Sequence, residues 1–259
     1  MRRLGAVLFD LDDTLHDDTA AYRGAASRVA ADVAKERGGD ATAIVEAYVA
    51  QSNTFWSTLD TSRLGDAIGD VRGKMWSRAL EAAGIEASEA LGRDCGERYN
   101  AYRSGLLVLF PEALGLLDDL RGRGIALGMI TNGFSETHRD KISQLRLDAV
   151  FDLVLIADEV GFVKPDPRVF VLAAERLGVP PARCAMVGDR YDRDIRTPLE
   201  LGMFAVWTNV RGEPVPAGAP APDADVPTLA GVAAALEPYL PPRPARDDAA
   251  DSFAAGREA

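Results

Sequence analysis

The chain has 259 residues, 47% of them hydrophobic, which is enough for one large domain or for a core with an inserted module. A net charge of −11 argues against nucleic acid and anionic membrane surfaces as partners, because both attract clusters of Lys and Arg. The only cysteines, Cys95 and Cys184, lie in no CxxC or CxxH pattern, which argues against a disulfide framework and a zinc site. No apolar run is long enough for a signal peptide or a membrane span, so we expect a soluble, cytoplasmic protein.

The first predicted element is a strand over residues 6–9 (AVLF), an apolar run typical of a strand buried on both faces. It ends at Asp10, and Asp12 follows two positions later. In an extended backbone these two side chains point the same way, so we expect their carboxylates to converge where open α/β sheets bind ligands. Their repulsion requires a cation or a shared proton. The alternative is a polar turn at Asp12 and Asp13, with Thr14 capping a helix.

The next block, residues 17–104, has a different composition. It is Ala-rich, with charges at helical spacing and glycine punctuation, and it predicts several helices and little strand. We therefore expect an inserted helical module. Phe55, Trp56 and Trp76 either line a substrate pocket or form the core of this module. Burial in the core is the usual place of large aromatic side chains, so none of them is taken as a site residue.

From Pro111 onward strands alternate with helices, which predicts an α/β fold with a doubly wound, mostly parallel sheet. Strands are predicted at 125–131, within 150–157, at 184–189 and at 203–207, and helices over 111–124, 135–145, 169–179, 194–201 and 228–240. Residues 211–225 are read as a proline-rich loop. We expect residues 1–16 and 105–240 to form the core, and 241–259, which lack apolar periodicity, to form a flexible tail.

Two polar signals stand where predicted strands run into loops. Thr131, followed by Asn132 and Gly133, offers a hydroxyl and backbone N–H groups suited to binding an anion. The alternative there is an ordinary turn. Pro165 restricts the backbone beside Lys164. We therefore expect Lys164 to be a fixed point charge that can neutralise a carboxylate and a phosphoryl oxygen together. The alternative there is a surface lysine.

A third signal is the segment MVGDRYDRDI, which contains Asp189 and, five residues later, Asp194. Mg²⁺ prefers carboxylate oxygens and keeps several waters, so one or two Asp ligands suffice. Asp189 fits the role of a direct Mg²⁺ ligand. Asp194 fits an indirect or water-mediated role, in which it orients Asp189. Asp192 is the rival for that second role. The alternative reading is a helix N-terminus at which acidic residues stabilise the helix dipole.

Together these segments resemble the four motifs of the haloacid dehalogenase superfamily of phosphohydrolases, in the subfamily I form with a helical C1-type cap. The matching segments are DLDDTL for the first motif, Thr131 for the second, KPDPRVF for the third and GDRYDRDI for the fourth. The fourth motif, GDxxxxD, selects Asp194 over Asp192. The resemblance extends from residue 6 to about residue 207 and implies that residues 17–104 form a cap that closes over the active site and selects the substrate.

The resemblance implies an enzyme that hydrolyses phosphoric monoesters with Mg²⁺ as cofactor and a small phosphorylated metabolite as substrate. Asp10 would attack phosphorus and form an aspartyl-phosphate. Asp12, taken as protonated, would donate a proton to the leaving alcohol and then activate the hydrolytic water.

The resemblance also assigns the binding residues. Mg²⁺ would be held by Asp10, Asp189 and the main-chain carbonyl of Asp12, with Asp194 acting indirectly. The phosphoryl oxygens would be bound by Thr131, Asn132 and Lys164, and Lys164 is also counted among the catalytic residues.

Three other functions remain open at this level. A phosphotransferase or phosphomutase of the same superfamily would pass the phosphoryl group to a second substrate hydroxyl. A 2-haloacid dehalogenase is disfavoured, because those enzymes lack the second Asp of the first motif and Asp12 is present here. A non-catalytic binding protein would need neither Asp10 nor Asp12. His16 and His138, the only histidines, are expected at the surface, although His16 is close to Asp12 in sequence.

Overall fold

The computed structural model describes residues 3–59, 62 and 67–243 of the chain. Within these residues one six-stranded sheet has the order β3-β2-β1-β4-β5-β6, and every neighbouring pair is parallel. The strands are β1 (Ala6–Phe9), β2 (Ala126–Thr131), β3 (Leu153–Ile156), β4 (Cys184–Gly188), β5 (Phe204–Thr208) and β6 (Ala224–Val226). The predicted doubly wound α/β fold is confirmed.

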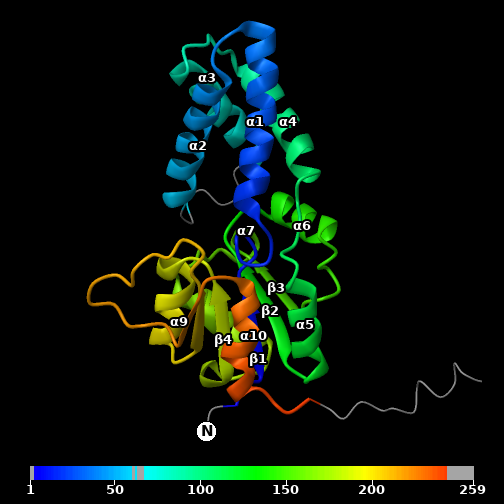
Figure 1. Cartoon of the computed structure of the whole chain (residues 1–259), viewed down its shortest axis with the longest axis vertical. Coiled ribbons are helices and arrows are strands. Elements are labelled where there is room, and N and C mark those ends of the chain that lie inside the picture. Colours follow the sequence, from blue (N-terminus) through cyan, green and yellow to red (C-terminus); the bar gives the residue numbers. More distant parts are fainter. Residues whose placement is uncertain (1–2, 60–61, 63–66, 244–259) are drawn as a thin grey trace, which may run out of the picture.

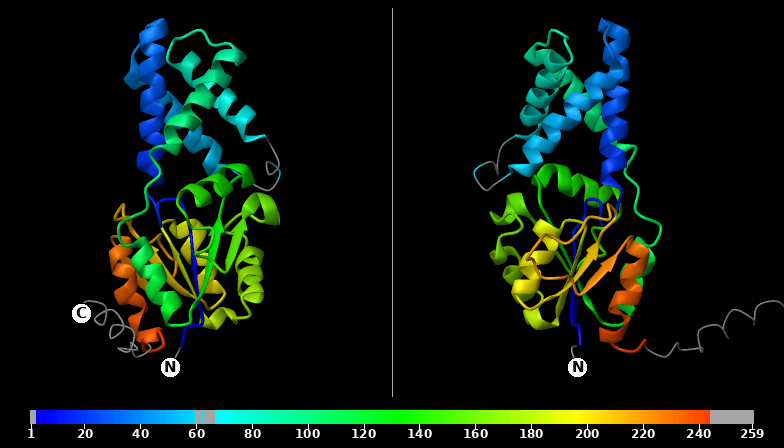
Figure 2. Two further views of the ribbon diagram at one scale, coloured as in Figure 1. Left: turned by 90° about the vertical axis from the view of Figure 1, so that its right-hand side faces the viewer. Right: turned by 60° about the vertical axis from the view of Figure 1, so that its left-hand side comes forward.

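Helices cover both faces of the sheet, as Figures 1 and 2 show. They are α5 (Ala113–Gly122), α6 (Ser135–Gln144), α7 (Ala157–Val160), α8 (Pro167–Arg176), α9 (Arg196–Glu200) and α10 (Val232–Leu236), with short turns at Pro181–Arg183, Tyr191–Ile195 (η3), Leu229–Gly231 and Glu237–Tyr239. In β1, Val7 and Phe9 pack on the side of α5 and α10, whereas Ala6 and Leu8 pack on the side of α8. The first strand is therefore buried on both faces, as its apolar run predicts.

Two elements differ from the sequence expectation. β6 lies at the end of the stretch that was expected to be only a proline-rich loop, and α7 follows β3 without a predicted helix. β6 has three residues and forms one edge of the sheet, where its side chains are half-buried or exposed. An edge strand this short has no hydrophobic periodicity from which it could be recognised.

Four further helices form a separate layer above the carboxyl ends of the strands (Figures 1 and 2). They are α1 (Asp18–Arg37), α2 (Ala41–Ser57), α3 (Ile68–Ala82) and α4 (Glu89–Ser104). Their shared core contains Phe55 and Trp76, and the Trp76 ring stacks on Tyr48 at 4.0 Å between centroids. The expectation that these two aromatics are core residues is confirmed. Phe134, from the loop after β2, is buried in the same cluster and ties this layer to the sheet.

The chain enters and leaves the four helices through two segments that run side by side. The amide of Phe110 donates to the carbonyl of Leu15 at 2.9 Å, and His16 forms an antiparallel bridge with Leu109. Both connections therefore cross above the first strand, close to Asp10 and Asp12.

The described part of the chain contains no helix that is long and apolar enough to cross a membrane. The flexible tail expected from residue 241 lies, from residue 244 onward, outside the described residues.

Candidate active site

Polar side chains gather at the carboxyl ends of the three central strands. Because β1 lies between β2 and β4, the residues that end or follow these strands meet at one edge of the sheet. Asp10 follows β1, Thr131 ends β2 and Asp189 follows β4, and all three are buried. Asp194 joins them from η3, the π-helical turn after β4. The structure thus brings together four residues that were singled out from the sequence.

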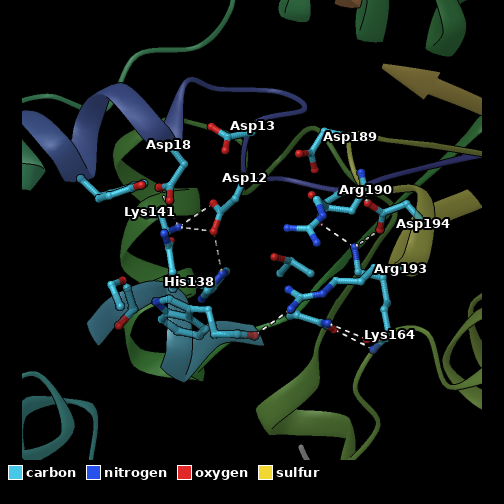
Figure 3. Close-up of a pocket in the computed structure, with 18 of the residues that line it drawn as sticks. Asp12, Asp13, Asp18, His138, Lys141, Lys164, Asp189, Arg190, Arg193 and Asp194 are labelled. Carbon is cyan, nitrogen blue, oxygen red and sulfur yellow. Dashed lines mark hydrogen bonds and ion pairs between the residues drawn. The ribbon is translucent and has the colours of Figure 1, made fainter. Parts of the chain in front are cut away.

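Lys164 lies buried among these carboxylates (Figure 3). Its Nζ donates to Asp10 Oδ1 at 2.7 Å and to Asp194 Oδ1 at 2.6 Å. Burial disfavours its charge, but the two carboxylates outweigh that effect and raise the pKa of Lys164 above its ordinary value. Lys164 is therefore a permanent cation that holds Asp10 in place, and it is not the surface lysine of the alternative reading.

Asn132 acts through Lys164 in this structure. Its side-chain amide donates to the Lys164 carbonyl at 2.9 Å, and its side-chain oxygen accepts from the Lys164 amide at 2.8 Å. Both ends of the side chain are thus engaged with the main chain of the lysine. The sequence assigned Asn132 to the phosphoryl oxygens, whereas the structure shows it holding the loop that carries Lys164.

Gly188 is the residue that lets Asp194 approach the end of β4. A Cβ atom at this position would lie 2.4 Å from Cβ of Asp194, a separation that no packing tolerates. The main-chain amide of Arg190 also donates to Asp194 Oδ2 at 3.1 Å. With Lys164 on Oδ1, both oxygens of Asp194 have partners, which suits a carboxylate that positions its neighbours.

Asp10, Asp189 and Asp194 each have a carboxylate oxygen within 4.8 Å of those of the other two. Burial is the main reason that the pKa of Asp10 is raised to about 7 and that of Asp189 to about 8, and the neighbouring carboxylates add to it. Among the described residues, one oxygen of Asp10 and one of Asp189 have no hydrogen-bond partner. Crowded, buried carboxylates with unused oxygens are a donor set that suits Mg²⁺.

Arg211, from the loop after β5, is a second cation at this cluster. Its guanidinium donates to Asp189 Oδ2 at 2.7 Å and also contacts Glu213 Oε1 at 3.1 Å. This contact leaves the other oxygen of Asp189 facing the cluster. Arg211 was not recognised from the sequence, because its partner lies 22 residues away in a different loop.

Asp12 lines the same cavity as Asp10, but its carboxylate is not part of the group formed by Asp10, Asp189 and Asp194. Both oxygens of Asp12 accept hydrogen bonds from Nζ of Lys141 on α6, at 2.5 and 2.7 Å (Figure 3). Burial alone would raise the pKa of Asp12, but Lys141 and the hydrogen bonds of His138 and His16 hold it well below its ordinary value. Asp12, which the sequence analysis took as protonated, is an ionised carboxylate in this structure.

Both histidines are buried beside Asp12, so the expectation that they lie at the surface is wrong. His16 Nε2 lies 2.9 Å from Asp12 Oδ1, and His138 Nε2 lies 3.4 Å from Asp12 Oδ2. Burial is the main reason that the pKa of His138 is lowered. In the fold both histidines are surrounded by polar residues. Their neighbours in the sequence are hydrophilic and do not indicate this burial.

The cluster around Asp12 continues into the four-helix layer. Lys141 also lies 3.3 Å from Asp18 in the first turn of α1, and Asp18 is paired with Arg103 in the last turn of α4. Two carboxylates, Asp12 and Asp18, are thus matched by two cations. Lys141, which holds Asp12, is therefore linked through Asp18 to the start of α1 and to the end of α4. These are the points where the chain enters and leaves the four-helix layer.

A cavity of about 180 Å³ opens between the sheet and the four-helix layer. Asp10, Thr131, Lys164 and Asp189 form its core side, together with Asp12 and the loops around it. Ser52, Asn53 and Trp56 of α2 and Tyr22 of α1 contribute to the other side. Trp56 thus lines this cavity and also packs on Phe55 and Phe134.

Lys141 and Arg193 are two further charged residues of this cavity that were not recognised from the sequence. His138 and Lys141 are three residues apart on α6, so both face the same side of that helix. The spacing of His138 and Lys141, directly after the Thr131 loop, is the one feature of the sequence that could have indicated their shared position. Arg193 lies inside the fourth motif, next to Asp194, where the acidic residues drew attention instead.

Comparison with known proteins adds a consistent set of similarities. A family model described as haloacid dehalogenase-like hydrolase matches residues 4–202. Phosphoserine phosphatase of Thermus thermophilus is 38% identical over 154 residues, which are 60% of this chain and only 61% of that protein. N-acylneuraminate-9-phosphatase of Homo sapiens is 31% identical over 217 residues, covering 82% of this chain and 85% of that protein. A solved 2-haloacid dehalogenase from Pseudomonas syringae has 29% identity and a TM-score of 0.63, covering 92% of this chain and all of that one.

Replacing Lys141 tests the cluster around Asp12. Lys141→Met leaves a carboxylate without its cation, so we expect the free energy of unfolding to fall by about 3 kcal/mol at pH 7. The pKa of Asp12 lies below the ordinary 3.8, so this stabilisation is complete above about pH 4 and declines as the pH falls further. Urea unfolding at several pH values measures both effects.

The double variant Asp12→Asn with Lys141→Met should recover part of the loss, because the unpaired charge is gone. The control is Arg139→Gln, which removes an exposed cation of the same helix that is paired with Glu159. A Lys141→Met protein as stable as the control would contradict the ion-pair account.

Proposed function

We propose that this chain, which belongs to the haloacid dehalogenase-like hydrolase family, is a Mg²⁺-dependent phosphatase that hydrolyses small phosphate monoesters. The observation that carries the proposal is the contact of Lys164 with Asp10 and Asp194 at the base of a cavity, beside Asp189. A carboxylate that is buried, fixed by a cation and open to a cavity on one side has the features of a nucleophile.

Asp10 is proposed to attack phosphorus and to form an aspartyl-phosphate while the bond from phosphorus to the ester oxygen breaks. Lys164 neutralises charge at the attacking carboxylate and stays within reach of the transferring oxygens. The hydroxyl of Thr131, buried at the end of the neighbouring strand, supports the role of a hydrogen-bond donor to those oxygens. Asn132 contributes by holding the Lys164 loop.

Mg²⁺ is proposed to be held by the unpaired oxygens of Asp10 and Asp189 and by the main-chain carbonyl of Asp12. When bound, it supplies two positive charges that offset the carboxylates and attract the phosphate. Without it, Asp10, Asp189 and Asp194 outnumber Lys164 and Arg211, and a phosphate dianion would approach a site of net negative charge. Asp194, whose oxygens are both engaged, acts by orienting Lys164.

Asp12 is proposed to protonate the leaving alcohol and then to take a proton from the water that hydrolyses the aspartyl-phosphate. Its contact with Lys141 favours the carboxylate, which is the form needed for the second role. For the first role Asp12 must carry a proton and turn from Lys141 towards the substrate. A residue two positions from the nucleophile, at the edge of the same cavity, is placed for such a turn.

The presence of Asp12 and its cluster favours phosphoryl chemistry over removal of a halide, because a halide leaves without a proton and needs no general acid. A dehalogenase is therefore the weaker proposal, despite the similarity to a solved 2-haloacid dehalogenase. Transfer of the phosphoryl group to a second hydroxyl remains the nearest alternative. Slow hydrolysis of the aspartyl-phosphate, accelerated by an added alcohol or sugar, would favour it.

Replacing Asp10 tests the nucleophile. Asp10→Asn keeps the size and most contacts of the side chain, so we expect a folded protein whose kcat falls by at least about a thousandfold. The measurement is phosphate release from a panel of small phosphate monoesters with Mg²⁺ present. Substantial residual turnover by this variant, free of contaminating phosphatase, would remove Asp10 from the mechanism.

Replacing Asp189 tests the metal site. Asp189→Ala removes a proposed ligand, so we expect Mg²⁺ to bind at least about tenfold more weakly, measured by titration calorimetry. The matched control is Asp192→Ala, which removes an exposed carboxylate three residues away that pairs only with Arg190 among the described residues. Equal Mg²⁺ affinity in the two variants would contradict the proposed ligand set.

A further inference from the structure

Five lysine and arginine side chains line the cavity between the sheet and the four-helix layer. Four of them are paired with carboxylates: Lys141 with Asp12, Lys164 with Asp10, Arg190 with Asp192, and Arg211 with Asp189. Their charges are therefore used within the protein. Arg193 is the remaining cation among the described residues that line this cavity, and no carboxylate of the described residues forms an ion pair with it.

Arg193 is bonded to a neutral group instead. Its Nη2 donates to the main-chain carbonyl of Trp56 at 2.7 Å, in the last turn of α2. A guanidinium has five N–H donors in a fixed planar fork, and this bond uses one of them. The other donors and the positive charge remain available at the cavity, where Figure 3 shows Arg193 beside Asp194 and Lys164.

The position of Arg193 defines which part of a substrate it can meet. It comes from η3, directly before Asp194, and it reaches across to the four-helix layer at Trp56. The phosphoryl group belongs at Asp10 on the sheet side. Arg193 therefore faces the part of the substrate that points away from the phosphorus, towards the α2 wall of the cavity.

The size of the cavity limits that part of the substrate. A volume of about 180 Å³ is below the usual range of about 300–1,000 Å³ for pockets that hold larger ligands. A short carbon skeleton thus lies between the phosphoryl group and any group that Arg193 contacts.

We propose that Arg193 binds a carboxylate on the substrate, so that the substrates are small phosphate monoesters of hydroxy acids. The inference rests on the proposed phosphatase function and adds a specificity-determining residue to it. A carboxylate accepts two parallel N–H bonds from a guanidinium, which makes an unpaired arginine a selective partner for it. A neutral alcohol group at the same place would gain much less.

The bond to Trp56 gives Arg193 a second, structural effect. A cation at the C-terminal end of α2 favours the helix dipole and holds the four-helix layer against the sheet. This effect does not depend on the substrate, so it changes the turnover of every ester by the same factor. Comparison of two esters that differ only at the carboxylate separates it from recognition.

The experiment measures kcat and KM of the full-length protein with Mg²⁺ for 3-phosphoglycerate and glycerol 3-phosphate, in which a hydroxymethyl group replaces the carboxylate. We expect the wild type to prefer 3-phosphoglycerate by at least about tenfold in kcat/KM. Arg193→Gln should lose about 10- to 100-fold for 3-phosphoglycerate, mainly in KM, and should change glycerol 3-phosphate by less than about threefold. Arg193→Lys keeps the charge and should recover part of the preference.

The matched control is Arg190→Gln, which removes an arginine of the same segment whose charge is already paired with Asp192. It should keep the preference of the wild type. The inference is overturned if Arg193→Gln affects both esters equally, or if the wild type hydrolyses them equally well. If the wild type releases phosphate from neither ester nor from the wider panel, the proposed function fails, and this inference fails with it.

Discussion

The contact between Lys164 and the carboxylates of Asp10 and Asp194 is the interaction on which the rest of the site depends. It joins three segments of chain, at residues 10, 164 and 194, at the end of the sheet. The strand order makes the contact possible, because β1 lies between β2 and β4. Asn132 fixes the main chain of the lysine, and the missing Cβ of Gly188 makes room for Asp194. Buried charges of this kind persist only where every partner is in place.

Charge compensation explains how an acidic chain can have a phosphate site. The carboxylates of Asp10, Asp189 and Asp194 outnumber the cations beside them, Lys164 and Arg211. This group therefore has a negative charge that a further cation can balance. The cluster of Asp12 and Asp18 is matched by Lys141 and Arg103 and needs none. Two neighbouring acidic groups thus differ in character: the first suits a metal ion, and the second holds the carboxylate of Asp12 beside the segments that lead to the four-helix layer. The net charge of the chain gives no information about the local charge balance of either group.

The sequence predicts the sheet and the four strand-end segments well, because each depends on local pattern. Apolar runs such as residues 6–9 predict buried strands, and the acidic or basic residues that follow them belong to one edge by topology alone. The sequence does not predict the orientation of Asp12, the burial of His16 and His138, or the pairing of Arg211. These depend on contacts between residues far apart in the chain, such as that of Lys141 with Asp12, 129 residues apart. The edge strand β6 was missed because three residues carry no periodicity.

The most direct test of this account is to look for the covalent intermediate on the protein itself. The wild type is mixed with Mg²⁺ and a rapidly hydrolysed monoester, quenched in acid within milliseconds, digested and analysed by mass spectrometry. We expect one added phosphoryl group on the peptide that contains residues 6–15, localised to Asp10 by fragmentation and absent from Asp10→Asn. Efficient turnover with no phosphorylated peptide, or with the phosphoryl group on another residue, would contradict the central claim that Asp10 is the nucleophile.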